Sequence, residues 1–164
     1  MADINVNVNE LYGKLREKIE SIHCDKDIET VDKKASEAES KRMHFFDYAF
    51  NLANEYHGDQ KRKSGEPYII HPIAVCDILV DLGMDCQSLV AALLHDVDDR
   101  KLSPETCENK DRAVAYMRSK GLSEDTIVRV KDIIGEVSFA GTDSVVPKTL
   151  EGMCVQDADR LDAL

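Results

Sequence analysis

The sequence has no C-x-x-C pair, no glycine-rich phosphate loop of the G-x-G-x-x-G or Walker type, and no apolar run long enough to cross a membrane. Its five cysteines are scattered and odd in number, which argues against a disulfide framework or a zinc ribbon and favours a reducing compartment. The first residues also lack the basic and apolar regions of a signal peptide. We therefore expect a cytoplasmic protein that does not bind a membrane.

Basic residues are also in short supply, with 21 Lys and Arg against 32 Asp and Glu and a net charge of −11. This balance argues against general affinity for nucleic acid or for anionic membranes. A polyanionic ligand would need a local basic patch, and the densest one is Lys61-Arg62-Lys63, followed by Ser64. In isolation such a run is usually a solvated turn. Its place shortly before His71 favours phosphate binding, since Arg grips phosphate oxygens through two parallel bonds.

No segment alternates between apolar and polar residues with a period of two, so the sequence predicts an all-α fold. His57-Gly58 is expected to end the second helix, and His44 within that helix to be a partly buried packing residue. The apolar spacing and the capping residues predict helices over residues 9–22, 40–56, 72–82, from Asp85 or Ser88 to His95, 109–120, 124–134 (ended by Gly135), and from Lys148 onward.

One apolar run, Leu89–Leu94, ends abruptly in His95 and Asp96. Burying an imidazole beside a carboxylate is costly unless something compensates for the lost hydration. A divalent metal does so, because imidazole nitrogen and carboxylate oxygen together suit Zn, Mn or Fe. Taken alone, the pair is better explained as a helix C-terminus with a satisfied histidine. The pair is not alone, however, because His71 lies upstream and Asp159 lies downstream.

The order H…HD…D resembles the signature of the HD superfamily of metal-dependent phosphohydrolases. In that superfamily the four side chains hold one metal, which implies the ligands His71, His95, Asp96 and Asp159 here. Asp157 lies close to Asp159 in the sequence, and we expect it to be the solvent-facing or supporting member of the pair.

Residues 41–97 closely resemble the hydrolase domain of RelA/SpoT-type (p)ppGpp enzymes, above all in the stretches Arg62–Pro72 and Leu89–Val97. The resemblance implies a small nucleotide as substrate and removal of the 3′-pyrophosphate of (p)ppGpp with Mn²⁺. It also implies that Arg62 and Lys63 contact the nucleotide, with Ser64 nearby; Lys61 would help to offset the phosphate charge.

After residue 97 the likeness changes. Where the alarmone hydrolases have a Glu-Asp pair that activates water, this chain has Asp99 and Arg100. Asp99 is the predicted general base, and Asp98 is the alternative. The asparagine that helps to hold the nucleotide in that family is replaced by Ala163.

Residues 95–164 instead resemble small stand-alone HD-domain hydrolases, whose substrates the sequence does not generally fix. Two alternatives therefore stay open: an HD nucleotidase or general phosphohydrolase, and a catalytically silent HD module that binds a nucleotide. We expect residues 1–40 to form an N-terminal helix and a polar connector, and residues 41–164 an irregular helical HD bundle with a central metal site. A domain truncated at its C-terminus is a further alternative, since both families continue with more helix.

Overall fold

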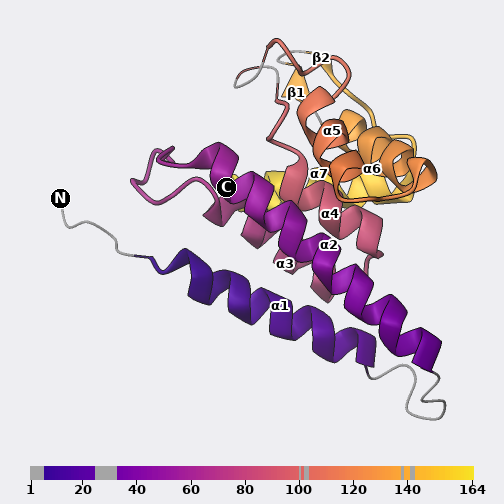
Figure 1. Ribbon diagram of the computed structural model, residues 1–164. Coiled ribbons are helices and arrows are strands. Elements are labelled where there is room, and N and C mark those ends of the chain that lie inside the picture. Colours follow the sequence, from indigo (N-terminus) through magenta and orange to yellow (C-terminus); the bar gives the residue numbers. More distant parts are fainter. Residues whose placement is uncertain (1–5, 25–32, 100, 102–103, 138, 141–142) are drawn as a thin grey trace.

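The computed structural model describes residues 6–24, 33–99, 101, 104–137, 139–140 and 143–164 (Figure 1). In these ranges the chain forms α1 (Val8–Cys24), α2 (Lys33–His57), α3 (Ile70–Asp81), α4 (Cys86–Leu94), α5 (Asp111–Ser119), α6 (Glu124–Val137) and α7 (Leu150–Asp162). The two-residue strands β1 (Phe139–Ala140) and β2 (Asp143–Ser144) pair antiparallel between α6 and α7. The prediction of an all-α fold is confirmed, with this small hairpin as an addition.

Helix α4 lies at the centre of the bundle and packs against α2, α3, α6 and α7 (Figure 1). All residues from Ser88 to Leu94 are buried, which explains why this segment is apolar on every side rather than on one stripe. The end of such a helix lies inside the molecule. Whatever follows α4 is therefore held among the other helices rather than exposed at the surface.

Residues at the helix termini explain where the helices next to the site begin and end. Gly58 and Gly83 have φ values of 42° and 69°, a backbone region that favours glycine, and they terminate α2 and α3 as predicted. Of the two predicted caps for α4, Asp85 is the one observed: its Oδ1 accepts a hydrogen bond from the backbone N–H of Ser88 at 2.9 Å.

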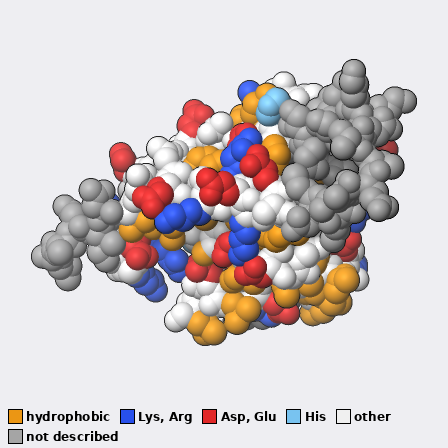
Figure 2. All heavy atoms as spheres, turned by 90° about the horizontal axis from the view of Figure 1, so that it is seen from below, with side chains coloured by type: hydrophobic (Ala, Val, Ile, Leu, Met, Phe, Trp, Pro, Cys, Tyr) orange, Lys and Arg blue, Asp and Glu red, His pale blue; other side chains and the backbone are white. Residues whose placement is uncertain are grey.

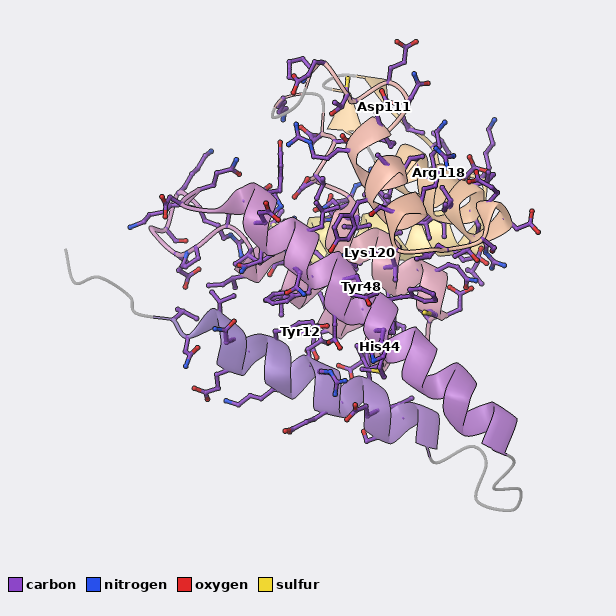
Figure 3. The ribbon with its side chains drawn as sticks, viewed as in Figure 1. Tyr12, His44, Tyr48, Asp111, Arg118 and Lys120 are labelled. Atoms are coloured by element: carbon purple, nitrogen blue, oxygen red, sulfur yellow. The ribbon has the colours of Figure 1, made fainter. Side chains whose placement is uncertain are left out.

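Helix α1 covers one side of the bundle, where Leu15 and Ile19 are buried in the common core. In Figure 3 the ring of Tyr12 lies between α1 and α2; it stacks on Phe50 with ring centroids 3.8 Å apart. The hydroxyl of Tyr12 donates to Asp47 Oδ1 at 3.0 Å. The predicted boundary at residue 40 falls within α2, and the division into a connector and a domain stays a prediction.

Two predicted helix ends are wrong. Helix α2 begins at Lys33 rather than near Ser40, because the Lys-, Ala- and Glu-rich stretch before Ser40 consists of good helix formers. Helix α6 continues through Gly135 to Val137. Val137 extends the buried stripe of α6, and its burial compensates for the roughly 1 kcal/mol that a glycine costs inside a helix.

Figure 2 shows acidic and basic side chains interspersed over the face seen from below, so the net negative charge does not form a single acidic surface there. Within the described ranges, no helix combines the length and the apolar character needed to cross a bilayer.

Candidate metal and phosphate site

The four predicted ligands lie on or directly after three helices, and each imidazole lies close to both carboxylates. His71 lies in the first turn of α3, His95 and Asp96 directly follow α4, and Asp159 lies in α7. Nε2 of His71 is 2.9 Å from Asp159 Oδ1 and 3.7 Å from Asp96 Oδ2. Nε2 of His95 is 3.3 Å from Asp96 Oδ2 and 3.5 Å from Asp159 Oδ1. The two imidazoles therefore face the same two carboxylates.

Both histidines are oriented through their other ring nitrogen. Nδ1 of His95 donates to the backbone carbonyl of Ala92 at 2.7 Å, and Nδ1 of His71 donates to Asp162 Oδ2 at 2.6 Å. Since a carbonyl and a carboxylate only accept, each Nδ1 carries the hydrogen. In the neutral imidazoles the lone pair is then on Nε2, the atom directed at the site.

The site attracts a positive charge. Burial by itself would lower the pKa of His95, but the negative charges of Asp96 and Asp159 raise that pKa to about 9. For Asp159 the directions are reversed: burial would raise its pKa, yet the hydrogen bond with His71 and the positive charges of His71 and His95 hold that pKa well below the usual value. A proton or a metal cation between the rings and the carboxylates would offset the negative charge of the two carboxylates.

An open cleft of about 690 Å³ leads to these residues. Arg62, Lys63 and Ser64 contribute to its wall, together with His71 and Asp96. Lys61, the fourth residue predicted to bind substrate, is exposed and lies outside this wall. The basic residues that do reach the cleft are therefore the last two of the run.

The loop before α3 presents these residues as a tight hairpin. The N–H of Gly65 donates to the carbonyl of Arg62 at 2.9 Å, and the N–H of Arg62 donates to the carbonyl of Glu66 at 2.8 Å. Gly65 has φ 93°, which a side chain would strain, so glycine is required to close this turn. The turn places Lys63 and Ser64 at an exposed tip.

The two candidate general bases differ in their surroundings. Asp98 is 0% exposed, and its carboxylate accepts hydrogen bonds from the N–H of Ala113 at 2.8 Å, the N–H of Arg112 at 3.3 Å and the hydroxyl of Thr106 at 2.5 Å. It thereby caps α5, whose own N-cap residue makes no side-chain cap.

Asp99 is only half-buried, and among the described residues its side chain accepts one hydrogen bond, from the N–H of Lys101 at 2.8 Å. It is not part of the cleft wall. The geometry favours Asp99 over Asp98 as the general base, and this role stays a prediction. Arg100 lies outside the described residues.

Two residues that the sequence analysis did not assign to the site support it. The hydroxyl of Tyr68 donates to Asp96 Oδ2 at 2.9 Å and fixes that carboxylate; burial and then the charge of Asp96 raise the pKa of Tyr68. His57, predicted only as a helix end, is 1% exposed and packs its ring 4.7 Å from that of Tyr68. The sequence offered no signal for His57 beyond its place before the hairpin loop.

Residues 49–117 match the family described as "HD domain". This region, which is similar to HD domains, covers less than half of the chain. Among curated proteins the HD region is similar to the guanosine-3′,5′-bis(diphosphate) 3′-pyrophosphohydrolase of Aquifex aeolicus, with 60% identity over 48 residues, which is 29% of this chain and 7% of that protein. It is also similar to the bifunctional (p)ppGpp synthase/hydrolase RelA of Mycobacterium tuberculosis, with 58% identity over 48 residues, 29% of this chain and 6% of that protein.

A longer match joins the chain to the GTP pyrophosphokinase of Streptomyces coelicolor, with 47% identity over 68 residues, or 41% of this chain and 8% of that protein. In each case the chain matches less than a tenth of its relative's length. The relatives therefore support the predicted resemblance to (p)ppGpp enzymes over the HD region.

The residues present in this site fit a divalent metal. Nε2 of His95 is buried and makes no hydrogen bond in the described part of the chain, although two carboxylate oxygens lie near it. The ligand atoms of His71, His95 and Asp96 lie within 4.8 Å of one another. Imidazole nitrogen and carboxylate oxygen together are the donor set of Mn, Fe and Zn sites.

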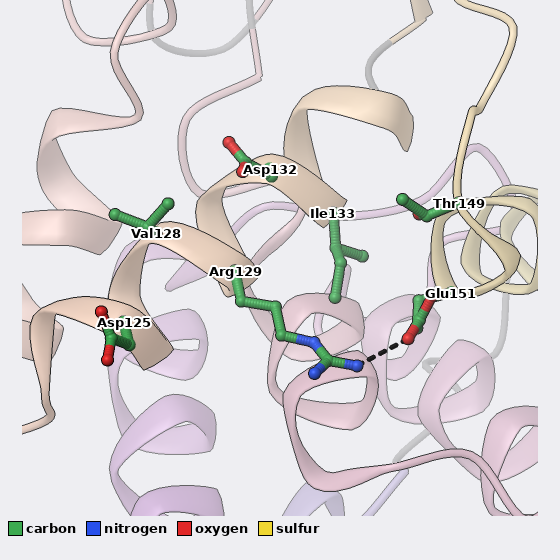
Figure 4. A pocket seen from close by; sticks show the side chains of 7 residues that line it. All are labelled: Asp125, Val128, Arg129, Asp132, Ile133, Thr149 and Glu151. Carbon is green, nitrogen blue, oxygen red and sulfur yellow. Dashed lines mark hydrogen bonds and ion pairs between the residues drawn. The ribbon is translucent and has the colours of Figure 1, made fainter.

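A second hollow, of about 400 Å³, lies between α6 and the start of α7 and contains none of the predicted site residues (Figure 4). Nη2 of Arg129 in this hollow forms ion pairs with Asp85 Oδ2 at 2.9 Å and with Glu151 Oε1 at 2.6 Å. His44 on α2 is exposed rather than partly buried, so that prediction is wrong; its ring centroid lies 6.3 Å from that of Tyr48 on the same helix (Figure 3).

Within the described ranges, Cys76, Cys86, Cys107 and Cys154 form no disulfide bond.

Proposed function

We propose that this chain is a divalent-metal-dependent phosphohydrolase that acts on a nucleotide polyphosphate in the cytoplasm, with removal of the 3′-pyrophosphate of (p)ppGpp as its reaction. The observation that carries the proposal is the convergence of His71, His95, Asp96 and Asp159 at the base of a cleft whose wall includes Arg62 and Lys63. The similarity of the HD region to (p)ppGpp enzymes supports the choice of nucleotide.

The proposed ligands are Nε2 of the two histidines and one oxygen each of Asp96 and Asp159. Mn²⁺ is the proposed metal. A divalent metal here would supply Lewis acidity, lowering the pKa of water and offsetting charge on a phosphate. Tyr68 holds Asp96 in place through its hydroxyl.

The chain's own residues would perform the remaining tasks. Arg62, Lys63 and Ser64 would hold the phosphates at the cleft wall, because fixed donors stabilise developing negative charge without reorganising. Asp99 would orient the attacking water and accept its proton, a contribution worth about 10²–10⁴-fold in rate.

The experiment combines a substrate panel with metal analysis. The purified full chain is given Mn²⁺ and either ppGpp, GTP or deoxynucleoside triphosphates, and the released phosphate species are separated by ion-exchange chromatography. The expected result is pyrophosphate from ppGpp. Release of orthophosphate from the other nucleotides would instead establish the nucleotidase alternative, and tight nucleotide binding without turnover under excess Mn²⁺ would establish the silent module.

Asp159 and Asp157 provide a matched pair of variants on the same helix. Asp159 faces both imidazoles, whereas the side chain of Asp157 is 73% exposed. We expect Asp159→Ala to lose bound metal and turnover together and Asp157→Ala to keep both. The reverse outcome would overturn the ligand assignment.

A further inference from the structure

Asp162, in the last turn of α7, forms a contact that no sequence pattern indicated. One oxygen, Oδ2, accepts from Nδ1 of His71 at 2.6 Å and lies 3.0 Å from Nη1 of Arg62. The backbone carbonyl of Asp162 accepts a second bond from Nη2 of Arg62, also at 3.0 Å. The carboxylate thus links the proposed metal ligand on α3 to the proposed phosphate-binding residue of the hairpin loop, and all three residues line the cleft.

The contact with His71 determines which ring nitrogen is available to a metal. With its Nδ1–H given to Asp162, His71 directs Nε2 toward Asp159 Oδ1 at 2.9 Å. His95 is held in the same way, but by the neutral carbonyl of Ala92. An acceptor at Nδ1 fixes the orientation and the tautomer of the ring, and such partners typically change metal affinity 10–100-fold.

The contact with Arg62 fixes the direction of the guanidinium. Its side chain is 25% exposed and is held by two bonds to one residue, whereas Lys63 and Ser64 at the tip of the loop are exposed. Arg has five N–H donors in a rigid plane, so two bonds to Asp162 leave others free for a phosphate. Without this anchor Arg62 would have to be ordered by each incoming substrate.

We propose that Asp162 is a positioning residue for both halves of the site: it orients His71 for the metal and Arg62 for the phosphates. The proposal rests on the function proposed above. The competing explanation is an ordinary ion pair at the rim of the cleft, which would contribute little to stability and would leave metal affinity unchanged.

The first test measures metal affinity without any substrate. Full-length protein is stripped with a chelator and titrated with Mn²⁺ by calorimetry. We expect Asp162→Ala to weaken binding about 10–100-fold. Asp162→Asn keeps an oxygen that can accept the Nδ1–H of His71 and should retain most of the affinity. Asp157→Asn, on the exposed side of α7, is the control and should bind as the unchanged protein does.

Equal affinity of the Asp162→Ala variant and the unchanged protein would overturn the proposal. So would an equal loss in Asp162→Ala and Asp162→Asn, since only the former removes the acceptor. Urea unfolding of each variant is measured in parallel. If Asp162→Ala fails to fold, the comparison of Asp162→Asn and Arg62→Gln decides: metal affinity must survive in both, and KM for ppGpp must rise in both.

The second test uses kinetics on ppGpp. Asp162→Asn removes the charge that anchors Arg62 while keeping His71 oriented, so KM should rise with kcat largely kept. A fall in kcat at constant KM would contradict the role assigned to Arg62. If the unchanged protein hydrolyses no ppGpp, the proposed function fails, and the metal titration still decides the role of Asp162 toward His71.

Discussion

Replacing Asp98 with alanine separates a structural role from a catalytic one. The buried carboxylate satisfies two backbone N–H groups at the start of α5. Loss of a helix cap costs about 1 kcal/mol. The N–H of Ala113, a residue that is 0% exposed, would also be left without a partner, which costs about 1–3 kcal/mol. We expect Asp98→Ala to lower the free energy of unfolding by about 2–4 kcal/mol, a large part of the 5–15 kcal/mol typical of a domain.

Urea unfolding followed by circular dichroism measures this loss, and Asp99→Ala is the matched control. Asp99 is half-buried and accepts a single hydrogen bond from the described residues, so its removal should change stability by less than about 1 kcal/mol. The same variant should slow turnover by about 10²–10⁴-fold if Asp99 is the general base. Unfolding of Asp98→Ala at the same urea concentration as the unchanged protein would refute the structural role of Asp98. Loss of turnover in Asp98→Ala at unchanged stability, with turnover kept in Asp99→Ala, would refute the assignment of the general base.

Two further predictions concern stability. Gly152→Ala would place a methyl group against Oε2 of Glu136 and 2.9 Å from its Cβ, so we expect urea unfolding to show a loss of about 1–3 kcal/mol. A variant as stable as the unchanged protein would contradict the packing described. In metal-free protein the pKa of His95 is raised from 6.5 to about 9. Protonation of His95 therefore stabilises the folded protein fully below pH 6.5. This stabilisation is lost as the pH rises toward 9, by at most about 1.4 kcal/mol per pH unit. Denaturation curves from pH 6 to 9.5 with a chelator should show this decline, and stability that rises over this range would contradict it.

The sequence predicted the parts of the site that depend on local pattern. His95 and Asp96 had to follow the central helix, because the apolar run of α4 ends there. The turn that carries Arg62 is also local, because Gly65 closes it within a few residues, although its hairpin form was not predicted. The caps at Asp85 and Gly83 are equally local. Such features are visible in sequence because the residues that interact are close together along the chain.

The parts that escaped prediction depend on packing between distant segments. Asp98 and Asp99 are chemically identical neighbours, and only the position of α5 shows that Asp98 caps it. Asp162 reaches Arg62 only because α7 packs against α3. The end of α6 was missed for a related reason: burial of Val137 outweighs the local preference of Gly135 to end a helix.

The placement of Asp159 on α7 has a consequence for the order in which the site forms. During synthesis a chain emerges from its N-terminus, so His71, His95 and Asp96 leave the ribosome before Asp159 does. A nascent chain that ends before α7 carries His71, His95 and Asp96 but still lacks Asp159. If the proposed metal site is correct, the full ligand set is complete only after α7 has been made and has docked on α3.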